Sequence, residues 1–211
     1  MPKKRQIRTA TRKELADAVG AKYRAASGSA MALRPWLLCA AIACCNPASA
    51  FDLRSPTIPP GATFPYAQRF EGFGCRGGNR SPALAWKDTP QGTRSFALTL
   101  YDPDAPTGAG WWHWVLVDLP ATTRGLPAGA GDPAGTALPA GARQLRNDFG
   151  SLGYGGPCPP AGSPPHHYVF TVYALKVDQL SLPADASPEL AGFMIHADAL
   201  GSATMTVRYG R

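Results

Sequence analysis

The stretch FALTLYDPDAPTGAGWWHWVLV (residues 96–117) decides the fold of this 211-residue chain. Residues 96–101 and 113–117 are apolar runs rich in β-branched and aromatic side chains, and turn-forming residues bound both of them. We expect the two runs to pair as a hairpin, with the loop 102–112 returning the chain. Asp102 ends the first strand and His113 begins the second, so both lie at the same end of the sheet.

Further β-strands are predicted in the second half of the chain. Residues 168–175 (YVFTVYAL) form the longest apolar run, and residues 204–209 alternate between apolar and polar side chains. Only residues 187–200 are typical of a helix, with Ser187 as N-cap and Gly201 just past the end. Several strands with one late helix favour an antiparallel sandwich or barrel-like fold over βαβ units.

The net charge of +7 is confined to the beginning of the chain. Residues 1–50 hold nine Lys and Arg against two acidic residues, whereas residues 51–211 hold twelve of each kind. The second part therefore has no basic excess that could release counterions from a phosphate backbone. We do not expect it to bind nucleic acid.

Residues 31–50, MALRPWLLCAAIACCNPASA, are typical of an export signal. The positively charged Arg34 is followed by ten mostly apolar residues and by a small-x-small cleavage site at residues 48–50. The apolar run is too short for a transmembrane helix, which needs about 20 residues, and the alternative is a short buried helix. We expect a signal peptide at 31–50 and a periplasmic or secreted protein, with residues 1–30 an upstream extension that is not native if Met31 is the true start. Cys44 matches a lipoprotein signal only poorly.

Cleavage after Ala50 would leave two cysteines, Cys75 and Cys158. An even pair in an oxidising compartment favours a disulfide. Two free buried thiols are the alternative.

Three tryptophans surround His113 in the run WWHW. Strand alternation predicts Trp112 and Trp114 on one face and Trp111 with His113 on the other. A Trp beside a His at a strand mouth combines an apolar wall with a polar group, as a small-molecule site requires. The preceding DPDAP is stiffened by two prolines, although such a segment is also common in solvated turns.

A second group of site residues follows the irregular segment 120–165, which is rich in Gly, Pro and Ala. Long irregular segments in compact domains are often functional, and we expect this one to be an ordered loop that forms one wall of a site. It ends in GYGGPCPP (153–160), where glycines permit close approach to a ligand. In the strand that follows, His166 and Tyr168 share a face and His167 points away. We assign no function to His167 or to His196.

Together these motifs resemble the phosphatidylethanolamine-binding protein family, and most closely its bacterial, Raf-kinase-inhibitor-like branch. The resemblance rests on DPDAP, WWHW, GYGGPCPP, HHYVFTVYAL and TMTVRYGR, and it spans about residues 52–211. It implies a mainly β fold with two antiparallel sheets in a Greek-key sandwich, one or two peripheral helices, a single domain at 51–211 and a small anion pocket. By motif position the ligand-binding residues are Asp102, Pro106, Trp111, His113, Cys158, Pro159, His166 and Tyr168.

The function that these residues predict is non-catalytic binding of a small anion such as a phosphoryl head group. His113 and His166 can donate hydrogen bonds, protonation of either adds positive charge, and Asp102 orients one imidazole. A hydrolase using the same three residues is an alternative. The lack of a G-x-S-x-G segment near the histidines argues against it. A metal site of two His and one carboxylate is possible by count alone, but we expect no metal and no cofactor. The remaining alternative is an inhibitor or interaction partner of another exported protein.

Export makes a direct prediction about the N-terminus. The mature protein should begin at Phe51, because a small-x-small site ends the apolar leader there. N-terminal sequencing of exported material measures this, and soluble cytoplasmic protein that retains residues 1–50 would contradict it.

Overall fold

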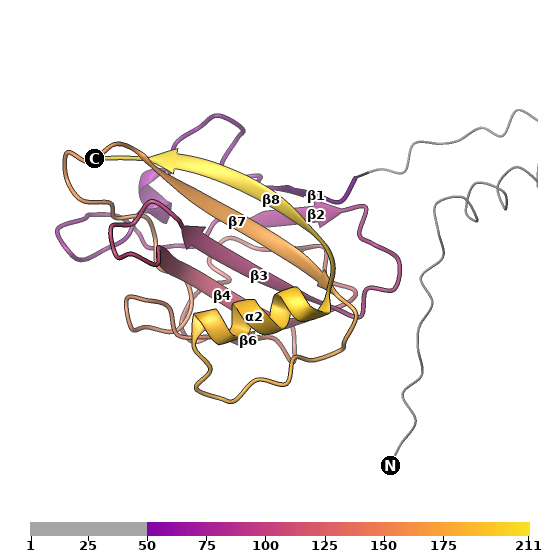
Figure 1. Cartoon of the computed structure of the whole chain (residues 1–211). Helices are drawn as coiled ribbons and strands as arrows, with labels where there is room; N and C mark the ends of the chain where they lie inside the picture. Colours follow the sequence, from indigo (N-terminus) through magenta and orange to yellow (C-terminus); the bar gives the residue numbers. More distant parts are fainter. Residues whose placement is uncertain (1–49) are drawn as a thin grey trace, which may run out of the picture. The chain divides into compact units, whose positions relative to one another are not determined.

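The computed structural model describes residues 50–211, so the predicted upstream extension and signal peptide lie outside the described residues. The described part is built mainly of strands, with one α-helix near its end (Figure 1). Its elements are, in chain order, β1 (Asp52–Arg54), the short 3-10 helix η2 (Tyr66–Gln68), β2 (Leu84–Lys87), β3 (Ser95–Asp102), β4 (Trp111–Pro120), β5 (Gly125–Leu126), β6 (Arg143–Gln144), β7 (His166–Leu175), α2 (Pro188–Asp198) and β8 (Ala199–Tyr209).

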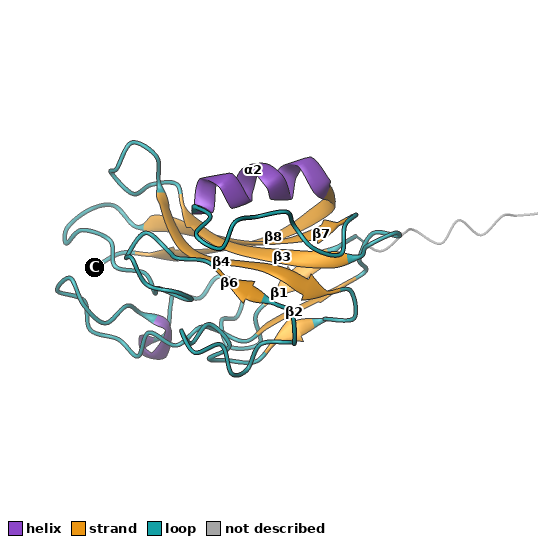
Figure 2. Ribbon diagram, turned by 90° about the horizontal axis from the view of Figure 1, so that it is seen from below, coloured by secondary structure: helices purple, strands orange, loops and turns teal. Residues whose placement is uncertain are grey.

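The strands form two antiparallel sheets. The larger sheet has the order β6-β4-β3-β7-β8, and the smaller has the order β1-β2-β5. Figure 2 shows α2 against one face of the larger sheet and the small sheet on the opposite side. The prediction of a mainly β fold with two antiparallel sheets and a late helix is therefore confirmed.

The larger sheet has an apolar layer on each face. Phe96, Leu98 and Leu100 of β3 are buried in the layer between the two sheets. Ala97, between them in sequence, belongs to the layer beneath α2, together with Ile195 of the helix. Since both faces of β3 are covered, successive residues 96–100 are all buried instead of alternating between buried and exposed, as in strands buried on both sides.

A β-bulge at His113 changes the direction of the tryptophans. Leu100 pairs with Trp114 and Tyr101 with Trp112, so His113 has no partner on β3. An extra residue in one strand shifts the alternation beyond it. Trp114 is consequently buried between the sheets, whereas Trp112 packs on the α2 side. The prediction that these two tryptophans share a face is wrong.

The helix begins where the sequence predicts and ends earlier. The Ser187 hydroxyl accepts a 3.2 Å hydrogen bond from the Leu190 amide, as an N-cap does. The helix ends at Asp198, and the next residue starts β8, so Gly201 lies in a strand. The reason is tertiary, because pairing of β8 with β7 along its whole length extends the strand to Ala199.

The segment 120–165 is irregular but ordered by many hydrogen bonds. The Tyr154 hydroxyl donates to the Gln68 carbonyl at 2.7 Å, and the Asn147 amide donates to the Gly153 carbonyl at 3.0 Å. The segment also contains β5 and β6, two strands of two residues each that are too short for periodicity to predict. Within residues 50–211, no helix has both the length and the hydrophobicity that crossing a membrane requires.

A disulfide joins Cys75 to Cys158, with the two Cα atoms 5.9 Å apart. It connects the tight turn at Gly72–Cys75, which two backbone hydrogen bonds close, to the end of the long irregular segment. Arg211 strengthens the same connection, because its guanidinium donates to the carbonyls of Pro159 and Gly74 at 2.6 and 3.0 Å.

The disulfide should contribute measurably to stability. Its partners are 83 residues apart in sequence, and closing a loop of that size stabilises the folded state by about 4–5 kcal/mol as an upper figure in the chain-entropy model. In urea titrations, we expect the free energy of unfolding of the double variant Cys75→Ser, Cys158→Ser to be lower than that of the parent by most of this amount. Equal stability of variant and parent would refute the contribution of the bond. Two titratable thiols in the unreduced, denatured mature protein would refute the bond itself.

Candidate anion-binding site

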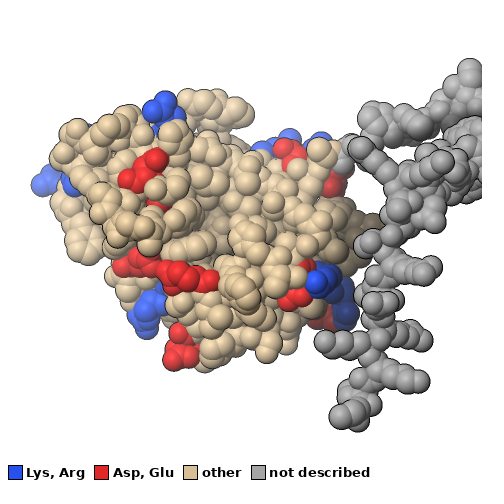
Figure 3. All heavy atoms as spheres, in the orientation of Figure 1, with Lys and Arg blue, Asp and Glu red and all other residues tan. Residues whose placement is uncertain are grey.

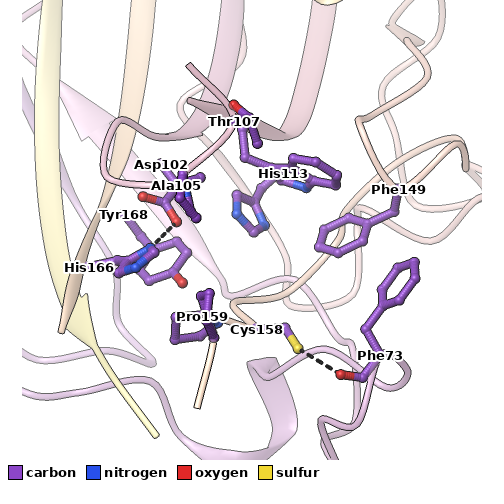
Figure 4. A pocket seen from close by; sticks show the side chains of 13 residues that line it. Phe73, Asp102, Ala105, Thr107, His113, Phe149, Cys158, Pro159, His166 and Tyr168 are labelled. Carbon is purple, nitrogen blue, oxygen red and sulfur yellow. Dashed lines mark hydrogen bonds and ion pairs between the residues drawn. The ribbon is translucent and has the colours of Figure 1, made fainter. Parts of the chain in front are cut away.

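A cavity of about 230 Å³ opens at the end of the large sheet where β3 ends and where β4 and β7 begin (Figure 4). The structure brings all eight residues predicted as ligand-binding to its lining: Asp102, Pro106, Trp111, His113, Cys158, Pro159, His166 and Tyr168. Five further lining residues were missed: Phe73, Ala105, Thr107, Phe149 and Pro160. Four of the thirteen, Phe149 and residues 158–160, come from the long irregular segment, which therefore forms a wall of the cavity.

A buried, hydrogen-bonded pair of Asp102 and His166 forms the polar end of the cavity. The Nδ1 atom of His166 lies 2.8 Å from Oδ2 of Asp102, and both side chains are almost inaccessible (Figure 4). The other carboxylate oxygen accepts a 2.9 Å hydrogen bond from the Asp104 amide. An ionised carboxylate only accepts hydrogen bonds, so Nδ1 of His166 carries a proton. Asp102 thus fixes both the orientation and the tautomer of this imidazole.

His113 is buried in a different way and is neutral near pH 7. Its Nδ1 atom lies 2.8 Å from the Gly155 carbonyl oxygen, which can only accept, so Nδ1 carries the proton and Nε2 a lone pair. Loss of solvation on burial lowers the pKa of His113 from 6.5 to about 4. The sequence-based view that both histidines donate to an anion therefore needs correction, because in the free protein Nε2 of His113 is an acceptor.

Two buried donors of the cavity have no hydrogen-bond partner among the described residues. These are the indole Nε1 of Trp111 and the hydroxyl of Tyr168, and both residues line the cavity. The Tyr168 hydroxyl approaches the Asp102 carboxylate but makes no hydrogen bond of standard geometry with it. Burial, reinforced by that carboxylate, raises the pKa of Tyr168 far above its usual value, so the hydroxyl keeps its proton. A buried polar group without a partner costs about 1–3 kcal/mol. A ligand with acceptor oxygens would recover part of that cost.

Ser163 lies beside the Asp102–His166 pair, although the sequence did not single it out. Its Oγ atom is 3.4 Å from Nε2 of His166, so Ser163, His166 and Asp102 follow one another as in a Ser-His-Asp triad. The serine hydroxyl, however, donates to the Pro160 carbonyl at 2.9 Å. Its proton is therefore directed away from His166. The only signal in the sequence was its position three residues before His166.

The other polar groups considered lie outside the cavity lining. His167 points away from the site, and its exposed ring pairs with Asp104 at 2.8 Å. His196 lies on α2 and bonds to the Gly192 carbonyl of its own helix. Across residues 50–211, no three His, Cys, Asp or Glu side chains are grouped so that they could hold a metal ion.

Comparison with known proteins agrees with this architecture. A model of the family described as phosphatidylethanolamine-binding protein matches residues 54–210. The chain is 51% identical over 162 residues to the UPF0098 protein YbcL of Escherichia coli K12, covering 77% of this chain and 88% of that one. It is 37% identical over 158 residues to the putative lipoprotein LppC of Mycobacterium tuberculosis, covering 75% and 71% of the two chains.

Solved structures give the same result. The crystal structure of E. coli YbcL, described as a new member of the mammalian PEBP family, superposes with a TM-score of 0.75 at 49% identity, covering 77% of this chain and 99% of that one. The putative PEBP homologue CT736 of Chlamydia trachomatis superposes with a TM-score of 0.63 at 28% identity, covering 77% and 98%. This chain belongs to the phosphatidylethanolamine-binding protein family.

The burial of His113 predicts a loss of stability in acid. Between pH 6.5 and about 4 the unfolded chain binds a proton at this residue that the folded protein excludes. The free energy of unfolding should therefore fall by about 3 kcal/mol as the pH is lowered through that window. Urea titrations of the parent and of His113→Gln measure it, and the variant should lack this part of the pH dependence.

His196→Gln is the matched control, since that residue is exposed on α2 and bonds to a backbone carbonyl of its own helix. It should keep the acid slope of the parent. If His113→Gln also keeps the full slope, His113 is not held neutral by burial.

Proposed function

We propose that this protein is an exported, non-catalytic binding protein for a small anion of the phosphoryl type. The observation that carries the proposal is the pair of buried donors, Trp111 Nε1 and the Tyr168 hydroxyl, that have no partner beside a preformed cavity. Such donors are suited to the oxygen atoms of an anion.

The histidines favour a phosphomonoester over a simple carboxylate. His166 is held by Asp102, and its protonated form would add a second donor, at Nε2. The lone pair of His113 Nε2 is instead suited to a group that donates a proton. A phosphate ester near its second pKa of about 6 carries both kinds of oxygen, acceptors and one O–H. The arrangement of donors and acceptor therefore matches a singly protonated phosphoryl group.

The state of the nearby hydroxyl and sulfur groups supports binding over hydrolysis. Cys158 is in a disulfide and offers no thiolate. The Thr107 hydroxyl donates to the Gly110 carbonyl at 2.6 Å, and the Ser163 hydroxyl donates to Pro160. Covalent catalysis needs a nucleophile paired with a base. Each of these groups is engaged elsewhere.

Export is supported by three independent features. The leader at residues 31–50 has the order of a signal peptide. The Cys75–Cys158 disulfide suits an oxidising compartment. One relative, LppC, is named a putative lipoprotein.

The charge distribution agrees with a small ligand instead of nucleic acid. Residues 51–211 carry twelve basic and twelve acidic side chains. On the face drawn in Figure 3, the two signs occur in small separate groups without a continuous basic area. Selectivity for an anion would therefore arise inside the cavity and not from a surface field.

Removal of His166 should abolish most of the binding. His166→Ala should weaken binding of inorganic phosphate by about 1.5–3 kcal/mol, roughly 10- to 150-fold, because a charge-assisted hydrogen bond is lost. Titration calorimetry at about pH 6 measures it, with thermal unfolding to verify that the variant is folded.

His196→Ala is the control for this experiment. That histidine lies on α2, away from the cavity lining, and its loss should change binding by less than about 0.5 kcal/mol. Sulfate, which carries no proton in this pH range, should bind more weakly than phosphate because His113 accepts. Unchanged phosphate binding by His166→Ala would place the site elsewhere.

A further inference from the structure

Three phenyl rings stand side by side at one edge of the cavity. Phe70 and Phe149 are stacked with centroids 4.0 Å apart, and Phe73 lies 5.9 Å from each of them. The planes differ by only 15° to 27°, so the rings present nearly parallel faces. Phe73 and Phe149 line the cavity directly. We call Phe70, Phe73 and Phe149 the aromatic rim.

Phe73 is exposed to an unusual degree for its type. With 74% of its surface accessible, it is the most exposed large hydrophobic side chain of residues 50–211. Its backbone is also in the left-handed region, at φ 49°, between Gly72 and Gly74, which have positive φ as well. Bulky residues rarely adopt this conformation, because it is strained. Neither core packing nor backbone preference accounts for a phenylalanine here.

The surrounding chain holds the rim in place. The turn that carries Phe73 is closed by the hydrogen bonds between Gly72 and Cys75 and is tied down by the disulfide. The sulfur of Cys158 lies 3.8 Å from the Phe73 carbonyl oxygen, a contact drawn in Figure 4. Gly155 leaves room for the rim, since a Cβ there would lie 2.5 Å from the ring of Phe149. The rim is thus a preformed surface.

The rim is continuous with the polar end of the cavity. Phe149 makes T-shaped contacts with Trp111 and His113, each with centroids 5.3 Å away, and His113 in turn meets Tyr168 at 5.1 Å. Figure 4 shows Phe73 and Phe149 on one side of the cavity and the Asp102–His166 pair on the other. One small ligand can therefore touch the proposed anion donors and the phenyl rings together.

We propose that the aromatic rim is a subsite for a planar aromatic group, so that the ligand is a small aryl phosphate. This inference rests on the proposed function, because it takes the anion to be held near Trp111, His166 and Tyr168. The volume of about 230 Å³ lies below the range of about 300–1,000 Å³ typical for drug-sized ligands. It suits one phosphoryl group with one ring.

Ring stacking distinguishes this ligand from one with an alkyl chain. Aromatic side chains attract other aromatic rings in offset or edge-on geometry beyond the effect of buried area alone. Parallel and partly exposed phenyl faces offer that geometry to a planar ring. A non-planar saturated ring of similar size would bury comparable area but would not stack.

Calorimetry with three phosphate monoesters tests the inference. Phenyl, cyclohexyl and methyl phosphate carry the same head group and differ in the substituent. We expect phenyl phosphate to bind about tenfold more tightly than methyl phosphate, with cyclohexyl phosphate clearly weaker than phenyl phosphate. Phe73→Ala should remove most of the preference for phenyl over methyl phosphate. Phe73→Tyr, which keeps a ring, should retain the parent's ratio of phenyl phosphate affinity to methyl phosphate affinity.

Phe193→Ala is the matched control, because that side chain is 71% exposed on α2 and does not line the cavity. This variant should keep the parent's ratio of phenyl phosphate affinity to methyl phosphate affinity. Equal affinity for phenyl and methyl phosphate would overturn the aromatic subsite while leaving the anion site standing. Cyclohexyl binding as tight as phenyl binding would overturn the preference for a planar ring. Absence of binding by all three esters would overturn the proposed function itself.

Discussion

The antiparallel pairing of β3 with both β4 and β7 is the constraint on which the rest of the structure depends. Because β3 runs opposite to its two neighbours, the end of β3 lies beside the beginnings of β4 and β7. Asp102, His113 and His166 are at those three positions, although His166 is 64 residues from Asp102 in sequence. Any other register along β3 would separate them, since strand pairing fixes which side chains are neighbours.

The two histidines have different partners. His166 has a carboxylate beside it, which keeps a proton on Nδ1. His113 has a backbone carbonyl beside it, and loss of solvation keeps it neutral near pH 7. In the proposed complex, a protonated His166 would donate from Nε2 while the neutral His113 accepts. A phosphoryl group that retains one proton would then be complementary to both.

The loops at the cavity edge are set by constraints of a different kind. The disulfide and the Arg211 hydrogen bonds tie together segments that the sheets do not connect. Glycines with positive φ and the closely packed Gly155 then leave the space that the phenyl rings occupy. The sheets thus fix the polar end of the cavity, while these covalent and steric constraints fix the aromatic end.

Strand patterns were sufficient to predict a mainly antiparallel β fold and the hairpin that joins Asp102 to His113, because both depend on local periodicity and on the order of strands. The eight residues around the cavity were instead implied by the resemblance of the motifs to the family. The bulge at His113, the helix end at Asp198 and the early start of β8 were decided by pairing with β3 and β7, which no local pattern contains. The neutral state of His113 and the exposed rim around Phe73 also required the tertiary structure, because desolvation and exposure depend on which distant segments cover a side chain.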